Sequence, residues 1–296
     1  MKEQMKKALA FLRHDLKLEE EASALYARQA AEMEEGWLKQ IFLENVADEK
    51  QHAEIFKYAI ERVEYSATNP TVSTGIAELD DILYGGVPEG YAVLLVSPPF
   101  DEKDLLAESF LLKGIDQDEV VLLLTTKMRK MTSELVTEKP EHFYLFLCSP
   151  RADLILPDGP NIFKFQSLDL TQINIKIESL LQDLSHRGKS PRRVVLEIVS
   201  DIILTHGAKT VRRWLRDLLT MLKVTKATIL STIDPGMHAS DETRVVIDLF
   251  DGYITVEEKE VNGVSTKTLA IKRLYSKKYL KKEWALNQAN WTRRIR

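Results

Sequence analysis

The stretch SPPFDEKDL, Ser97–Leu105, decides how the larger part of this chain is predicted to fold. It follows a short apolar run, residues 91–96, which is typical of a buried strand, and it precedes a helical pattern. A phosphate-binding loop of the form G-x-x-x-x-G-K-[ST] occupies this place in nucleotide-binding sheets, where its glycines let backbone N–H groups close on the phosphates. Lys103 stands at the lysine position of that motif. The stretch therefore marks the place of a phosphate loop.

The other positions of the motif are changed. Ser97 and Glu102 replace the two glycines, Asp104 replaces the hydroxyl residue that holds magnesium, and Asp101 adds another carboxylate. Like charges brought together out of water repel one another even after screening, so these carboxylates would oppose a triphosphate. We predict a degenerate loop that no longer binds phosphate, and ATP is not expected as a cofactor.

The segment before the loop, Ser73–Ser97, reads STGIAELDDILYGGVPEGYAVLLVS and resembles the opening of KaiC-like members of the RecA superfamily of ATPases. Those proteins begin with a Ser-Thr-Gly-Ile turn, a short helix that ends in a Gly-Gly pair, a Pro-x-Gly turn and the first core strand. The matching positions are Thr74, Gly75, Ile76, Leu79, Asp80, Leu83, Gly85, Gly86, Pro88 and Gly90. The resemblance extends over residues 73–285 and implies a RecA-like fold with a degenerate phosphate loop.

The order of elements in this part of the chain agrees with that resemblance. Short apolar runs alternate with helical patterns, which indicates a mainly parallel sheet covered by helices. The predicted strands are 91–96, 120–126, 143–148, 162–165, 193–199, 227–232, 245–247, 252–257 and 267–275. The predicted helices are 104–113, 170–185 and 208–223.

Two further positions can be compared with KaiC-like enzymes. Where the family carries adjacent catalytic glutamates after its second core strand, this chain has Thr126 and Lys127. Glu197 corresponds to the aspartate that is linked to magnesium. Phosphoryl transfer needs its positioning and charge-stabilising groups together, so ATPase activity is not expected. Lys103 and Glu197 are the residues that could still hold a nucleotide.

The N-terminal part has two long helical patterns, Met5–Met33 and Trp37–Val63, which predict an antiparallel hairpin. Glu19, Glu49 and His52 fall on the apolar stripes of these helices rather than on the solvated faces. A carboxylate in that position costs several kcal/mol unless something positive compensates it. A bound metal ion is one such compensation.

The motif FLENVADEKQHAE, residues 42–54, resembles the second helix of rubrerythrin and ferritin-like proteins, and the hairpin is similar to an encapsulated ferritin, half a four-helix bundle that pairs to complete a di-iron site. That resemblance implies that Glu19 and Glu49 are carboxylate ligands, that His52 is a nitrogen ligand and that Tyr26 lies near the metal. Iron is the expected metal, although such ligands also accept manganese or zinc, and the implied activity is that of a ferroxidase-like oxidoreductase.

A Glu-x-x-His pair is also common by chance on charged helices. The acidic segment LEEEAS, residues 18–23, can equally be a solvated face. In that case the hairpin is only a seam through which two copies associate.

Composition excludes several classes of protein. The chain has 296 residues, 44% of them hydrophobic, and a net charge of −4, which argues neither for nor against a nucleic-acid partner. The single Cys148 excludes an intrachain disulfide and a cysteine zinc cluster. No apolar run is long enough to span a bilayer, so we expect a cytoplasmic protein without a membrane partner.

These observations predict a multidomain α plus α/β protein. The expected parts are a ferritin-like hairpin (1–65), a linker (66–72), a KaiC/RecA-like domain (73–278) and a basic, aromatic tail (279–296) that docks on protein rather than on nucleic acid. The predicted function is metal binding by the hairpin, with an inactive ATPase domain as an assembly or regulatory platform and self-association through both parts. Two alternatives are a nucleotide-binding regulator that does not hydrolyse its ligand and a purely structural oligomer.

Overall fold

The computed structural model describes residues 3–261 and 264–286. The chain divides into two compact units, Met1–Pro70 and Thr71–Arg296. Among the described residues, none of the helices has the length and apolar composition needed to cross a bilayer.

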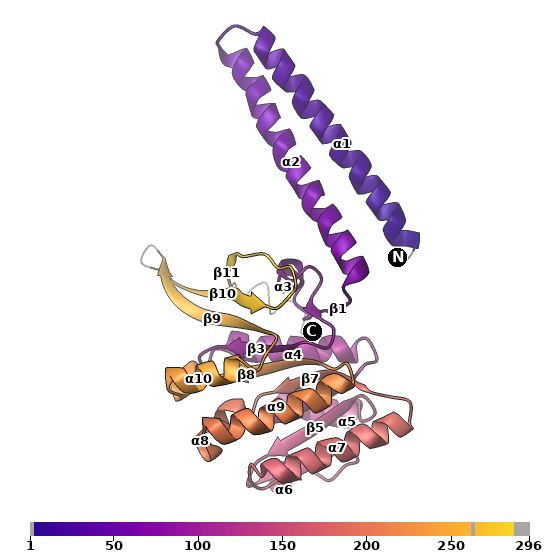
Figure 1. Ribbon diagram of the computed structural model, residues 1–296, viewed down its shortest axis with the longest axis vertical. Helices are drawn as coiled ribbons and strands as arrows, with labels where there is room; N and C mark the ends of the chain where they lie inside the picture. Colours follow the sequence, from indigo (N-terminus) through magenta and orange to yellow (C-terminus); the bar gives the residue numbers. More distant parts are fainter. Residues whose placement is uncertain (1–2, 262–263, 287–296) are drawn as a thin grey trace. The chain divides into compact units, whose positions relative to one another are not determined.

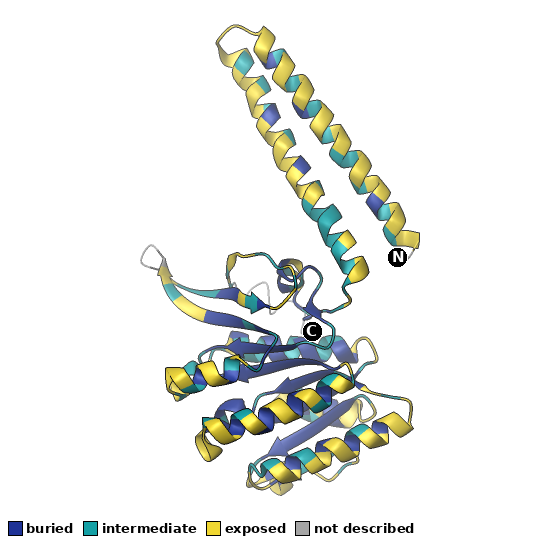
Figure 2. Ribbon diagram, in the orientation of Figure 1, coloured by how far each residue is buried: buried dark blue, intermediate teal, exposed yellow. Residues whose placement is uncertain are grey.

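The smaller unit is the predicted hairpin of two antiparallel helices, α1 (Glu3–Glu32) and α2 (Trp37–Thr68), which run side by side (Figure 1). Helix α2 continues past the predicted end at Val63, because no proline or glycine interrupts the pattern before Asn69. The seam between the helices is narrow (Figure 2), and its buried members are Leu9, Ser23, Ala30, Val46 and Ala53.

The larger unit is built on a sheet of nine strands in the order β11-β10-β9-β3-β8-β7-β4-β5-β6, and a separate pair joins β1 to β2. The strands from β9 to β6 in this order are parallel to one another, whereas β10 pairs antiparallel with both of its neighbours, β9 and β11. The strand bounds are β1 Thr71–Val72, β2 Val87–Pro88, β3 Ala92–Val96, β4 Val120–Thr125, β5 Phe143–Cys148, β6 Ile162–Phe165, β7 Pro191–Leu196, β8 Thr228–Ile233, β9 Gly252–Val261, β10 Val264–Leu274 and β11 Glu283–Ala285. The predicted fold class is confirmed.

Helices cover both faces of this sheet. Successive strand residues alternate between two hydrophobic clusters, as Leu94 and Leu95 do in β3, because side chains in a strand point to opposite faces. Helices α7, α8, α9 and α10 pack in one cluster, and α3, α4, α5 and α6 pack in the other. Their bounds are α3 Ala77–Ile82, α4 Asp101–Ile115, α5 Lys130–Glu138, α6 Ala152–Ile155, α7 Leu170–His186, α8 Val199–His206, α9 Ala208–Val224 and α10 Ser240–Ile247.

One predicted strand is wrong. Residues 245–247 form the end of helix α10 rather than a strand. The helix begins after Ala239, whose N–H donates to the Glu242 carboxylate at 3.3 Å, and Val246 enters the core from the helix. A three-residue apolar run cannot distinguish a strand from one buried turn of a helix.

Strand β7 contains a buried arginine whose side chain points toward helix α4. Arg193 of β7 is 0% exposed, and its Nε donates to Glu119 at 2.5 Å. Its other donors bind the Gln117 side chain and the backbone oxygens of Ser73 and Phe110. Burial lowers the pKa of Arg193, while the contact with Glu119 opposes that shift. The side chain therefore ties strand β7 to the chain before α3 and to the end of α4.

The described part of the C-terminal tail lies against the larger unit. Strand β11 adds to the edge of the sheet through β10, and Tyr279, Leu280 and Trp284 pack against the cluster that holds α4. Trp291, also assigned to this tail, lies outside the described residues.

Candidate functional site

The segment that corresponds to a phosphate loop is short. After β3, residues 97–100 form the loop and α4 already begins at Asp101, earlier than the predicted start at Asp104. Pro98 and Pro99 carry no backbone N–H, and the N–H of Phe100 is bound to the oxygen of Pro98. Backbone donors for an anion are therefore confined to the first turn of α4, and one of them, the N–H of Lys103, already donates to the oxygen of Phe100 at 3.1 Å.

Lys103 lies in that first turn. Its side chain is half-buried, and it has no ion-pair partner within residues 3–261 and 264–286. A lysine side chain at a helix N-terminus is suited to a phosphate group. Lys103 is thus the predicted nucleotide-binding residue in this turn whose positive charge is not already paired with a carboxylate of the described residues.

Glu102, at the second glycine position of the motif, is enclosed in the protein. It is 2% exposed, and its two carboxylate oxygens accept bonds from Nζ of Lys267 in β10 at 2.8 and 3.1 Å. The same Nζ lies 4.6 Å from the centre of the Phe100 ring. An internal ion pair therefore neutralises the carboxylate that replaced the glycine.

The carboxylates at the magnesium position surround an arginine. The loop after β3 and Glu197 after β7 lie at the same edge of the sheet, separated by β8. Arg129, which precedes α5, places Nη2 at 2.7 Å from Glu197 Oε1 and at 3.3 Å from Asp104 Oδ1. Its Nε lies 3.8 Å from Glu108. Sequence reasoning missed Arg129, because no motif includes it; its only signal is a basic residue shortly after β4, the neighbour of β7.

The charges of this cluster perturb one another. Burial raises the pKa of Glu108. Burial alone would lower the pKa of Arg129, but Glu197, Asp104 and Glu108 outweigh it and raise that pKa. Arg129 therefore stays protonated, since an arginine already titrates far above neutral pH.

One acceptor at the site has no partner. The Glu197 side chain is 7% exposed, and its Oε2 is buried without a hydrogen bond from the described residues. Buried polar atoms are nearly always paired, so an unpaired carboxylate oxygen indicates room for a donor from a ligand or a water.

This geometry corrects the charge argument made from the sequence. Glu102 is paired with Lys267 and Asp104 with Arg129, so that Asp101 is the exposed carboxylate of the three. The repulsion expected from three unpaired carboxylates is therefore much reduced.

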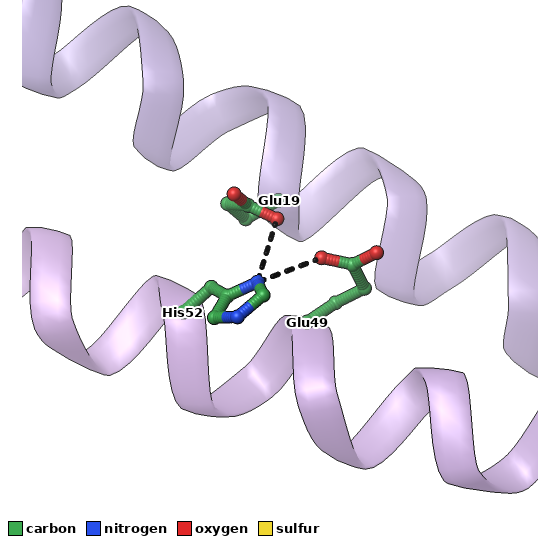
Figure 3. Close-up of side chains that lie close together, drawn as sticks. All are labelled: Glu19, Glu49 and His52. Carbon is green, nitrogen blue, oxygen red and sulfur yellow. Dashed lines mark ion pairs between the residues drawn. The ribbon is translucent and has the colours of Figure 1, made fainter.

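The hairpin brings its three predicted ligands together, as Figure 3 shows. His52 Nδ1 lies 3.4 Å from Glu49 Oε2 and 3.8 Å from Glu19 Oε2, and the three candidate ligand atoms lie within 4.8 Å of one another. A hydrogen bond with Glu49 is the main cause that raises the pKa of Glu19. Tyr26 contacts the Phe42 ring, with 6.4 Å between centroids. The role of these residues as metal ligands stays a prediction.

Comparison with known proteins identifies the larger unit. The family model of the KaiC ATPases matches residues 72–289. The chain belongs to the KaiC family. Its larger unit is thus a KaiC-like domain of the RecA superfamily, whereas the family match begins after the hairpin.

The KaiC-like domain is similar to proteins of Pyrococcus and Synechocystis. A UPF0273 protein of Pyrococcus furiosus is 26% identical over 209 residues, which cover 68% of this chain and 83% of that protein. The circadian clock protein KaiC2 of Synechocystis is 24% identical over 212 residues, 70% of this chain and 36% of KaiC2. A crystal structure of a KaiC-like protein from Pyrococcus horikoshii covers 74% of this chain and 95% of that protein, with a TM-score of 0.57 and 19% identity.

Membership of the KaiC family overturns the cofactor prediction. We expected iron, or manganese or zinc, and did not expect ATP. The chain instead belongs to a family of ATPases. The prediction is therefore wrong, and a nucleotide is the ligand that the family indicates.

Proposed function

We propose that the KaiC-like domain is a nucleotide-binding regulatory module. The observation that carries this proposal is the pair of groups kept at one edge of the sheet: Lys103 without an ion-pair partner among the described residues, and Glu197 with an unpaired buried oxygen. The side chain of Lys103, at the N-terminus of α4, would hold phosphate oxygens, and Glu197 would accept a hydrogen bond from the ligand. Thr126 and Lys127 provide no carboxylate to orient an attacking water, so the module binds its nucleotide without hydrolysing it.

Titration calorimetry with ATP tests this function. The native chain should bind ATP with a Kd in the micromolar range, and Lys103→Ala should weaken binding by about tenfold or more, because a bond to a charged phosphate is lost. Lys113→Ala, in the last turn of the same helix, is the matched control and should bind like the native chain. Absence of ATP binding by the native chain, or equal affinity in the two variants, would exclude the proposed site.

We also propose that the hairpin associates with a second copy of itself. Phe11, Leu18 and Leu25 of α1 recur every seven residues and are 58, 50 and 50% exposed, and Ile41 and Ile55 of α2 are 44 and 57% exposed. Helical spacing places both sets on one side of the seam.

The opposite side of the hairpin has a different character. It is a shallow groove whose lining includes Glu20, Lys50, Glu54 and Lys57. One face is therefore rich in exposed apolar side chains, with Asp48 as a charged member between Ile41 and Ile55, and the other face is charged. Two helices alone cannot cover the apolar face, and a like face of a second hairpin would complete a four-helix bundle.

Sedimentation velocity tests the hairpin contact. Leu18→Glu combined with Leu25→Glu should reduce the oligomer mass of the full chain, because charges would enter the apolar contact. Ala24→Glu combined with Ala27→Glu, on the grooved side, should leave the mass unchanged. A native chain with the mass of a monomer, or equal masses in the two variants, would contradict association through this face.

A further inference from the structure

We infer that Arg129 takes the place of the divalent metal ion in the nucleotide site, so that this site binds its nucleotide as a metal-free anion. The inference rests on the nucleotide-binding function proposed above. It concerns which cation accompanies the phosphates and can fail while that function stands.

Arg129 lies where a phosphate-loop site would hold its metal ion. In a phosphate-loop site the metal ion lies between the hydroxyl residue that follows the lysine and an acid at the end of another strand of the same sheet. Asp104 and Glu197 stand at those two positions, and Nη2 of Arg129 binds both, at 3.3 and 2.7 Å. The guanidinium thus lies between the two residues that would otherwise hold the ion.

The positive charge of Arg129 opposes the binding of a metal ion at the same place. A divalent cation placed between Asp104 and Glu197 would meet a permanent positive charge within a few ångströms, in a cluster whose arginine is 17% exposed. Without Arg129 the same place would hold Asp104, Glu197 and the nearby Glu108, an oxygen-rich group of the kind that Mg²⁺ and Mn²⁺ prefer. The arginine therefore excludes the ion and supplies positive charge in its stead.

The guanidinium of Arg129 also keeps N–H donors that can bind the nucleotide. Nη2 serves Asp104 and Glu197, whereas Nη1 makes no hydrogen bond to the described residues. A guanidinium can keep one edge on a carboxylate and present the other N–H groups to a phosphate oxygen. Arg129 can therefore contact the nucleotide while Glu197 holds it in place.

Titration of ATP with and without metal gives the main test. The native chain should bind ATP in EDTA within about threefold of its affinity in Mg²⁺, a factor that corresponds to less than one hydrogen bond. Arg129→Met should lose about tenfold or more in EDTA and regain affinity when Mg²⁺ is added. Arg129→Lys, which keeps the charge, should remain independent of metal.

Mn²⁺ binding, followed by electron paramagnetic resonance without nucleotide, gives a second readout. Arg129→Met should bind one more Mn²⁺ per chain than the native protein, and that ion should be lost when Glu197→Gln is added. Because the comparison is with the native chain, ions held elsewhere cancel.

The outcomes separate the two proposals. Native binding of ATP only in the presence of Mg²⁺ would overturn the role of Arg129 and leave the nucleotide function intact. Absence of ATP binding under both conditions would remove the function and the inference with it. An unchanged Mn²⁺ count in a folded Arg129→Met chain would also overturn the inference, because it would show that the arginine does not occupy an ion site.

Discussion

Replacing Arg193 with methionine should lower the free energy of unfolding of the larger unit by about 3–5 kcal/mol. The guanidinium is 0% exposed, and its loss would leave Glu119 without its 2.5 Å partner. The backbone oxygens of Ser73 and Phe110 would lose their donor in the same place. Urea denaturation followed by tryptophan fluorescence measures the loss, since Trp214 and Trp284 belong to this unit.

The neighbouring arginine provides the control. Arg192 pairs with Glu89 and Glu119 but is 33% exposed, so water can replace its contacts. Arg192→Met should therefore change the stability by no more than about 1 kcal/mol. A similar loss in the two variants would mean that burial does not set the importance of Arg193.

The sequence predicts the fold of the larger unit because its signals are local. The turn and glycine pattern between Ser73 and Ser97 resembles one family, and each buried strand is a short apolar run bounded by turns. The strand predicted at 245–247 is wrong because three apolar residues carry no period.

The candidate site is predicted only in part, because its ion pairs join residues far apart in the chain. Lys267 lies 165 positions from Glu102, and Glu197 lies 68 positions from Arg129. A sequence pattern shows that the carboxylates are close to one another but does not show which cations reach them. That missing information led us to expect repulsion of phosphate and to exclude ATP.

In the hairpin, too, the sequence predicts which charged residues lie together but not what neutralises them. Helical spacing correctly places Glu49 and His52 on one face of α2, since residues three apart share a face, and the packing of α1 on α2 brings Glu19 to them. The same spacing is compatible with a metal site and with a hydrogen-bonded pair of carboxyl groups, as the raised pKa of Glu19 beside Glu49 indicates. The periodicity of a helix thus locates such a group but does not identify what neutralises it.

Replacing Lys267 with methionine should destabilise the larger unit by about 3–5 kcal/mol, because Glu102 would remain as a buried carboxylate without its main partner. Glu102 is 2% exposed, and both its oxygens bind Lys267. The midpoint of urea denaturation measures this loss. Lys259→Met is the matched control, since Lys259 forms an exposed pair with Glu283, and this substitution should leave the denaturation midpoint nearly unchanged.

A double variant separates the charge of Glu102 from the packing of Lys267. Glu102→Gln combined with Lys267→Met removes both charges, so it should recover most of the stability lost in Lys267→Met. No recovery would mean that the aliphatic part of Lys267 and its contact with the Phe100 ring matter more than the ion pair. Recovery would show that Lys267 of β10 stabilises the first turn of α4 by neutralising Glu102, the residue at the glycine position of the motif. It would also show that the loop keeps its shape without a glycine at that position.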